Sequence, residues 1–91
     1  MNESSREDLT IKIVLDVFLE VSQIDPCYFS PDSSLKTDMG LNNEEIELIF
    51  NHSIRNANLM FPNGPLPNVD SLREIVTTLL KLDVKHKNHA A

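Results

Sequence analysis

The chain has 91 residues, of which 41% are hydrophobic and 5% aromatic, and it contains no Trp. This length excludes a second domain, and the aliphatic composition favours a small all-α bundle. The net charge is −6, and residues 1–50 hold 11 acidic side chains against 3 basic ones. Because an acidic N-terminal half repels phosphate backbones, we expect no nucleic-acid binding. The same acidic charge favours a protein partner that carries a basic patch.

The N-terminal part of the chain does not have the pattern of a signal peptide or a membrane span. Lys12, Asp16 and Glu20 interrupt its apolar residues, and no basic region precedes them. The single Cys27 has no partner for an internal disulfide or a CxxC zinc motif, which indicates a reducing compartment. We therefore expect a cytoplasmic protein; separately, we expect it to be a monomer.

A first helix is predicted from about Arg6 to Gln23, with Ser5 as its cap. Lys12, Asp16 and Glu20 recur every four residues and mark one exposed stripe. The rest of the circumference is broadly apolar, as expected for a helix that packs against more than one neighbour.

Residues 24–41 form a long loop, because Pro26, Pro31 and the polar residues after it prevent a continuous helix. A loop of this length in a small domain must be held in place. The candidate anchors are Tyr28, Phe29, Leu35 and Met39.

A second helix is predicted from about Asn43 to Asn56 or Asn58. Gly40 suits the turn before it, and Asn42 followed by Glu45 has the spacing of a capping box. The expected inner face consists of Ile46, Ile49, Phe50, Ser53, Ile54 and Ala57. Three acids, Glu44, Glu45 and Glu47, remain for solvent or a partner. The first two also lie in the first turn, where negative charge interacts favourably with the helix dipole.

Three prolines and Gly64 follow, so residues 59–67 can hold at most one short helical turn. A last helix then runs to about Asp83 with a cap at Asn68 or Asp70. Its expected inner face is Leu72, Ile75, Val76, Leu79 and Leu82. The elements form one domain over residues 6–84, with a flexible N-terminus at 1–5 and a flexible basic tail at 85–91.

This plan resembles the acyl carrier protein family over nearly the whole folded chain. The stretch FSPDSSLKTDMG at 29–40 is similar to the family's loop, which offers a Ser- or Thr-led turn, a hydrophobic anchor and Asp-Leu-Gly. Counted without gaps from Gly40, the family's aromatic-Gly-Ile-x-Ile-Pro segment falls on ANLMFP at 57–62, with the proline in register. The resemblance implies a carrier-like bundle and a link to fatty-acid or polyketide biosynthesis.

The family carries its phosphopantetheine arm on the serine of Asp-Ser-Leu at the start of the second helix. The corresponding residues here are Asn42, Asn43 and Glu44, so Asn43 occupies the serine position. An amide has no hydroxyl to form the phosphodiester. The resemblance therefore implies a carrier-like protein without a prosthetic group, which is not an enzyme and serves as a protein-interaction module.

The expected interaction surface consists of Asn42, Asn43, Glu44, Glu45, Glu47 and Leu48. The family presents acids of its second helix to basic patches on its enzymes, and carrier-recognising enzymes or assembly factors are the partners that this implies. Leu48 lies off the inner face and could add an apolar contact, although scattered exposed leucines are normal.

Two alternatives stay open at this point. A literal Asp-Ser-Leu occurs at Asp70, Ser71 and Leu72, so Ser71 could carry phosphopantetheine in a working acyl carrier. The more ordinary interpretation is that Asp70 and Ser71 cap the last helix while Leu72 fills the core. In the second alternative, the bundle binds an apolar small molecule. No metal site is expected, because His52 is remote in sequence from His86 and His89.

Overall fold

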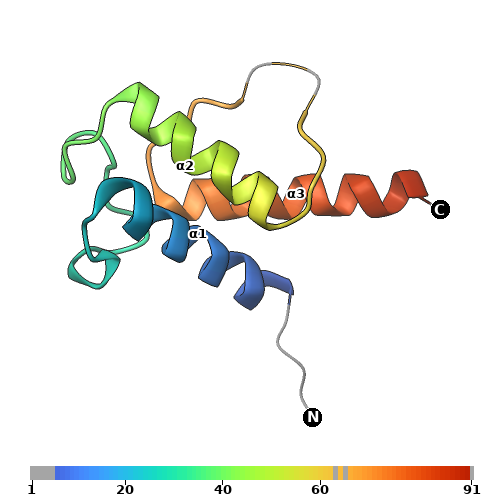
Figure 1. Cartoon of the computed structure of the whole chain (residues 1–91), viewed down its shortest axis with the longest axis horizontal. Helices are drawn as coiled ribbons and strands as arrows, with labels where there is room; N and C mark the ends of the chain where they lie inside the picture. Colours follow the sequence, from blue (N-terminus) through green and yellow to red (C-terminus); the bar gives the residue numbers. More distant parts are fainter. Residues whose placement is uncertain (1–5, 63, 65, 91) are drawn as a thin grey trace, which may run out of the picture.

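The computed structural model describes residues 6–62, 64 and 66–90, with side chains up to Leu82. Within these residues the elements are α1 (Arg6–Ser22), the 3-10 turn η1 (Pro26–Tyr28), α2 (Asn43–Asn56) and α3 (Leu72–Ala90). α1 packs against both α2 and α3, and Figure 1 shows it (blue) beneath α2 (green). The expected all-α bundle of three main helices is confirmed.

The core is aliphatic, with Phe18 and Phe50 as its aromatic members, and it draws on all three helices and both connections. Its buried apolar side chains are Val14, Val17, Phe18, Leu35, Met39, Leu41, Ile46, Ile49, Phe50, Ile54, Val69, Leu72, Ile75 and Leu79. The face predicted for α2 is buried as expected, except that Ala57 is only half-buried. On α3, Val76 and Leu82 are also only partly buried.

The first loop is held by three of its four predicted anchors. Leu35 and Met39 are buried, and Phe29 packs against the core from the edge. The prediction for Tyr28 is wrong, because its side chain is 81% exposed. Asp25 caps η1 and Pro26 begins it, and this turn leaves Tyr28 at its outer end.

Within the described residues, the one short 3-10 element is η1, in the first loop. We expected such a turn at most near residues 59–67, and the described residues of that range contain none. The predicted end of the last helix at about Asp83 is also wrong, since α3 continues to Ala90. The predicted cap Ser5 lies outside the described residues.

Candidate functional site

The start of α2 is built by the last residues of the first loop. Gly40 has a φ of 75°, which glycine adopts without steric cost. Leu41 is buried, and its N–H donates to the carbonyl of Leu35 over 2.9 Å. The side chain of Asn42 accepts the N–H of Glu45 at 2.8 Å, and the Glu45 carboxylate accepts the N–H of Asn42 at 3.0 Å. The predicted capping box is therefore present and fixes where α2 begins.

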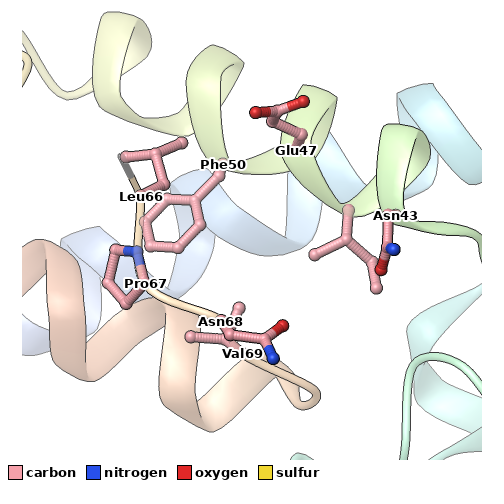
Figure 2. Close-up of a pocket in the computed structure, with 8 residues that line it drawn as sticks. Asn43, Glu47, Phe50, Leu66, Pro67, Asn68 and Val69 are labelled. Atoms are coloured by element: carbon pink, nitrogen blue, oxygen red, sulfur yellow. The ribbon is translucent and has the colours of Figure 1, made fainter. Parts of the chain in front are cut away.

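Asn43 is the first residue of α2, and its side chain is exposed. It lines a pocket of about 190 Å³ that we call the α2 pocket. Figure 2 shows α2 on one side of this pocket and the segment that leads to α3 on the other. The lining residues are Asn43, Ile46, Glu47, Phe50, Leu66, Pro67, Asn68 and Val69.

The α2 pocket is small for a ligand site. Pockets that enclose drug-sized molecules hold about 300–1,000 Å³. A cavity of about 150 Å³ accommodates one benzene molecule, so the α2 pocket has room for a group of roughly that size. This space suits a partner's side chain better than a long acyl chain.

The exposed side of the first two turns of α2 is acidic with one apolar side chain among the acids, whereas the exposed Arg55 lies in the last turn. Glu44 and Glu47 are exposed, and no ion pair engages either of them within the described residues. Leu48 is 46% exposed, and it lies one helical turn from Glu44 and Glu45. Glu45 is only partly exposed, because its carboxylate belongs to the capping box. The six residues predicted as a partner surface thus lie together at the start of α2.

Ser71, the alternative attachment site, is 8% exposed and immediately precedes α3. Its hydroxyl oxygen accepts the N–H of Glu74 at 3.2 Å, as a helix cap does. A phosphodiester on Ser71 would need both this cap and the packing around it to open.

The prediction that Asp70 could cap α3 is wrong. Its carboxylate instead connects the first loop to the start of that helix. Its carboxylate accepts the hydroxyl of Ser34 at 2.6 Å and the N–H of Lys36 at 3.0 Å. Its own carbonyl accepts the N–H of Leu35 at 2.8 Å. The hydrogen bond from Ser34, followed by that from Lys36, lowers the pKa of the Asp70 carboxyl.

No group of three or more His, Cys, Asp and Glu side chains that could hold a metal ion occurs in the described residues. The side chains of His86 and His89 lie outside that description. The helices, as far as they are described, are too short or too polar to cross a membrane.

The residues that the sequence analysis missed are Leu66, Pro67, Asn68 and Val69, which close the α2 pocket opposite Asn43. The sequence predicts a non-helical segment here, with Asn68 as a candidate cap for the last helix. The prolines indicate a non-helical segment, but no local signal says that this segment folds back against α2.

No protein-family model, curated protein or solved structure matches this chain. The resemblance to acyl carrier proteins therefore stays a prediction that rests on the residues quoted above.

Proposed function

We propose that this chain is an acyl-carrier-like domain that is not primed at the start of α2 and acts as a protein-interaction module. The observation that carries this proposal is Asn43, an exposed amide at the first position of a well-capped helix. The family's phosphopantetheine does not fit here, because neither Asn42 nor Asn43 has a hydroxyl to which it could be joined.

The partner that we propose is an enzyme or assembly factor that recognises carrier folds through a basic patch, in the cytoplasm. Two features support it: the carboxylates of Glu44 and Glu47 are not neutralised by ion pairs within the described residues, and Leu48 offers an apolar contact beside them. Complementary charge speeds the encounter and selects the partner, while a buried apolar side chain lengthens the complex's lifetime.

The first test is a priming assay. Incubation with a promiscuous phosphopantetheinyl transferase and coenzyme A should leave the protein's mass unchanged. The gain of one pantetheine arm would contradict the proposal, and tandem mass spectrometry would then show whether the arm is on Ser71.

Restoration of the family's motif provides the positive control for that assay. The triple variant Asn42→Asp, Asn43→Ser, Glu44→Leu should be primed, because it supplies the hydroxyl and keeps a carboxylate oxygen as the helix cap. Asn43→Ser alone should not be primed, since Glu44 still occupies the leucine position. If the triple variant shows a native far-UV circular dichroism spectrum and still gains no arm, the resemblance to carriers is wrong.

The interaction surface needs a binding test of its own. Titration calorimetry with the same transferase should show that Glu44→Lys with Glu47→Lys weakens binding by about tenfold, or about 1.4 kcal/mol. The matched control is Asp16→Lys with Glu20→Lys, which makes the same charge change on the exposed stripe of α1. Equal weakening by both pairs would assign the effect to net charge and contradict the proposed surface.

A further inference from the structure

A second and larger concave site lies against α1. It is a groove of about 540 Å³ between α1, α3 and the first-loop residues 25–31, which we call the α1–α3 groove. Its lining residues are Glu7, Ile11, Val14, Leu15, Asp25, Pro26, Cys27, Phe29, Pro31, Leu72, Arg73, Val76 and Thr77. None of them lines the α2 pocket, so the two sites are separate.

The inner surface of the groove is apolar. Val14 and Leu72 are buried, whereas Ile11 is exposed and Leu15 and Val76 are only half-buried. A ligand that covers apolar side chains exposed to water is stabilised, because the removal of apolar surface from water is favourable. The groove's volume lies within the range of about 300–1,000 Å³ that is typical of small-molecule sites, unlike that of the α2 pocket.

The charges at the edge of the groove favour a cation. Glu7 and Asp25 contribute carboxylates, and Arg73 is the only basic side chain among the lining residues. Arg73 is already paired, because its Nε and Nη2 donate to the carboxylate of Asp32 at 2.6 and 3.3 Å. The hydrogen bond and charge of Asp32 raise the pKa of the Arg73 guanidinium, and Glu7 raises it further. Since Asp32 offsets the charge of Arg73, the two carboxylates of Glu7 and Asp25 leave the groove with a net negative charge, which would repel an anionic ligand and attract a cationic one.

We propose that the α1–α3 groove binds a small amphipathic cation, whose apolar body lies against Ile11, Leu15 and Val76 and whose positive group lies at an end of the groove, beside the carboxylate of Glu7 at one end or of Asp25 at the other. If a cavity of about 150 Å³ holds the six carbons of benzene, the groove accepts a body of about ten to twenty carbons. This binding does not depend on the protein-interaction role proposed for α2.

The test uses three ligands with the same decyl chain and different head groups, each below its micelle concentration. These are decyltrimethylammonium, decyl maltoside and decanoate. In a nuclear magnetic resonance titration at low salt, the cation should bind about tenfold more tightly than decanoate, with the neutral ligand between them. Chemical-shift changes should centre on Ile11, Leu15 and Val76. Absence of binding by the cation, or equal affinity for decanoate, would overturn the proposal.

Cys27 provides an independent readout of the same site. It is the only cysteine of the chain, it is exposed, and it lines the groove. A bound ligand should therefore slow its alkylation by iodoacetamide, with the same order of effect among the three head groups. Binding that shifts resonances but leaves this rate unchanged would place the ligand elsewhere.

Two sets of variants connect the binding to the groove. Thr77→Trp fills the groove from an exposed position of α3, whereas Thr78→Trp adds the same bulk on the same helix outside the lining. Thr77→Trp should abolish binding of decyltrimethylammonium and Thr78→Trp should not. Glu7→Gln with Asp25→Asn should remove the preference for the cation while keeping the cap of η1. Unchanged cation preference in this charge variant would contradict the proposed site even if Thr77→Trp failed to fold.

Discussion

Leu35 offers the sharpest test of how the first loop is held. Its side chain is 0% exposed although it belongs to no helix, and it packs among core residues from all three helices. Leu35→Ala removes most of this side chain and leaves a cavity. The backbone hydrogen bonds of Leu35 to Asp70 and Leu41 remain available in the variant.

The expected loss can be estimated from comparable core truncations. Buried Leu→Ala substitutions cost about 2–5 kcal/mol, and a loop can close part of the cavity, so we expect about 3 kcal/mol. A domain of this size has a free energy of unfolding of about 5–14 kcal/mol, so the variant should still fold at 25 °C. The same loss should lower Tm by about 12–24 °C.

Urea unfolding at 25 °C, followed by circular dichroism at 222 nm, measures this change as a lower midpoint at constant slope. Tyr28→Ala is the matched control in the same loop. Because Tyr28 is exposed, its truncation should change stability by no more than about 0.5 kcal/mol. A loss below about 1 kcal/mol for Leu35→Ala, or equal losses for the two variants, would refute this account of the loop.

Three further predictions concern the ends of the helices and can be tested by the same urea unfolding. Asn42→Ala should cost about 1 kcal/mol, because α2 loses its cap, and a neutral result would contradict the capping box. Gly40→Ala should cost about 1–2 kcal/mol through its positive φ, whereas Gly64→Ala should be neutral or stabilise by up to about 1 kcal/mol. The pKa of Asp70 is lowered in the folded state, so its contribution is complete above the unfolded value near 3.8 and is lost as the pH falls through the folded value. Asp70→Asn should therefore lessen the decline of stability in acid, and an unchanged acid profile would argue against the tie between Asp70 and Ser34.

Much of the fold could be predicted from the sequence because its signals are local. The apolar spacing from Ile46 to Ile54 fixes the buried side of α2, and Asn42 with Glu45 fixes its first residue. The anchoring role of Leu35 could also be predicted, since it is a single leucine among Ser, Asp, Lys and Thr, and an apolar side chain in a polar loop is expected to pack against the core.

The errors arise where the outcome depends on contacts between distant segments. Tyr28 and Phe29 are adjacent aromatic residues, and only the packing of the loop against the bundle decides which of them is covered. Asp70 has the residue type of a helix cap, but its carboxylate accepts from Ser34, which is remote in sequence. The turn η1 had a local signal that we interpreted only as a helix breaker, namely Asp25 followed by Pro26 at the first position of a helical turn.

The first loop physically connects the two proposed binding sites. Its residues 25–31 form a wall of the α1–α3 groove, and its last residues, Gly40 and Leu41, lead into the cap Asn42 that starts α2. Between these two parts, Leu35 holds the loop to the core and Asp70 holds it to the start of α3. A displacement of the loop at Leu35 should therefore disturb both sites at once. Thr77→Trp changes only the groove and should leave partner binding at the interaction surface on α2 intact. A loss of both functions in that variant would mean that the loop transmits changes from one site to the other.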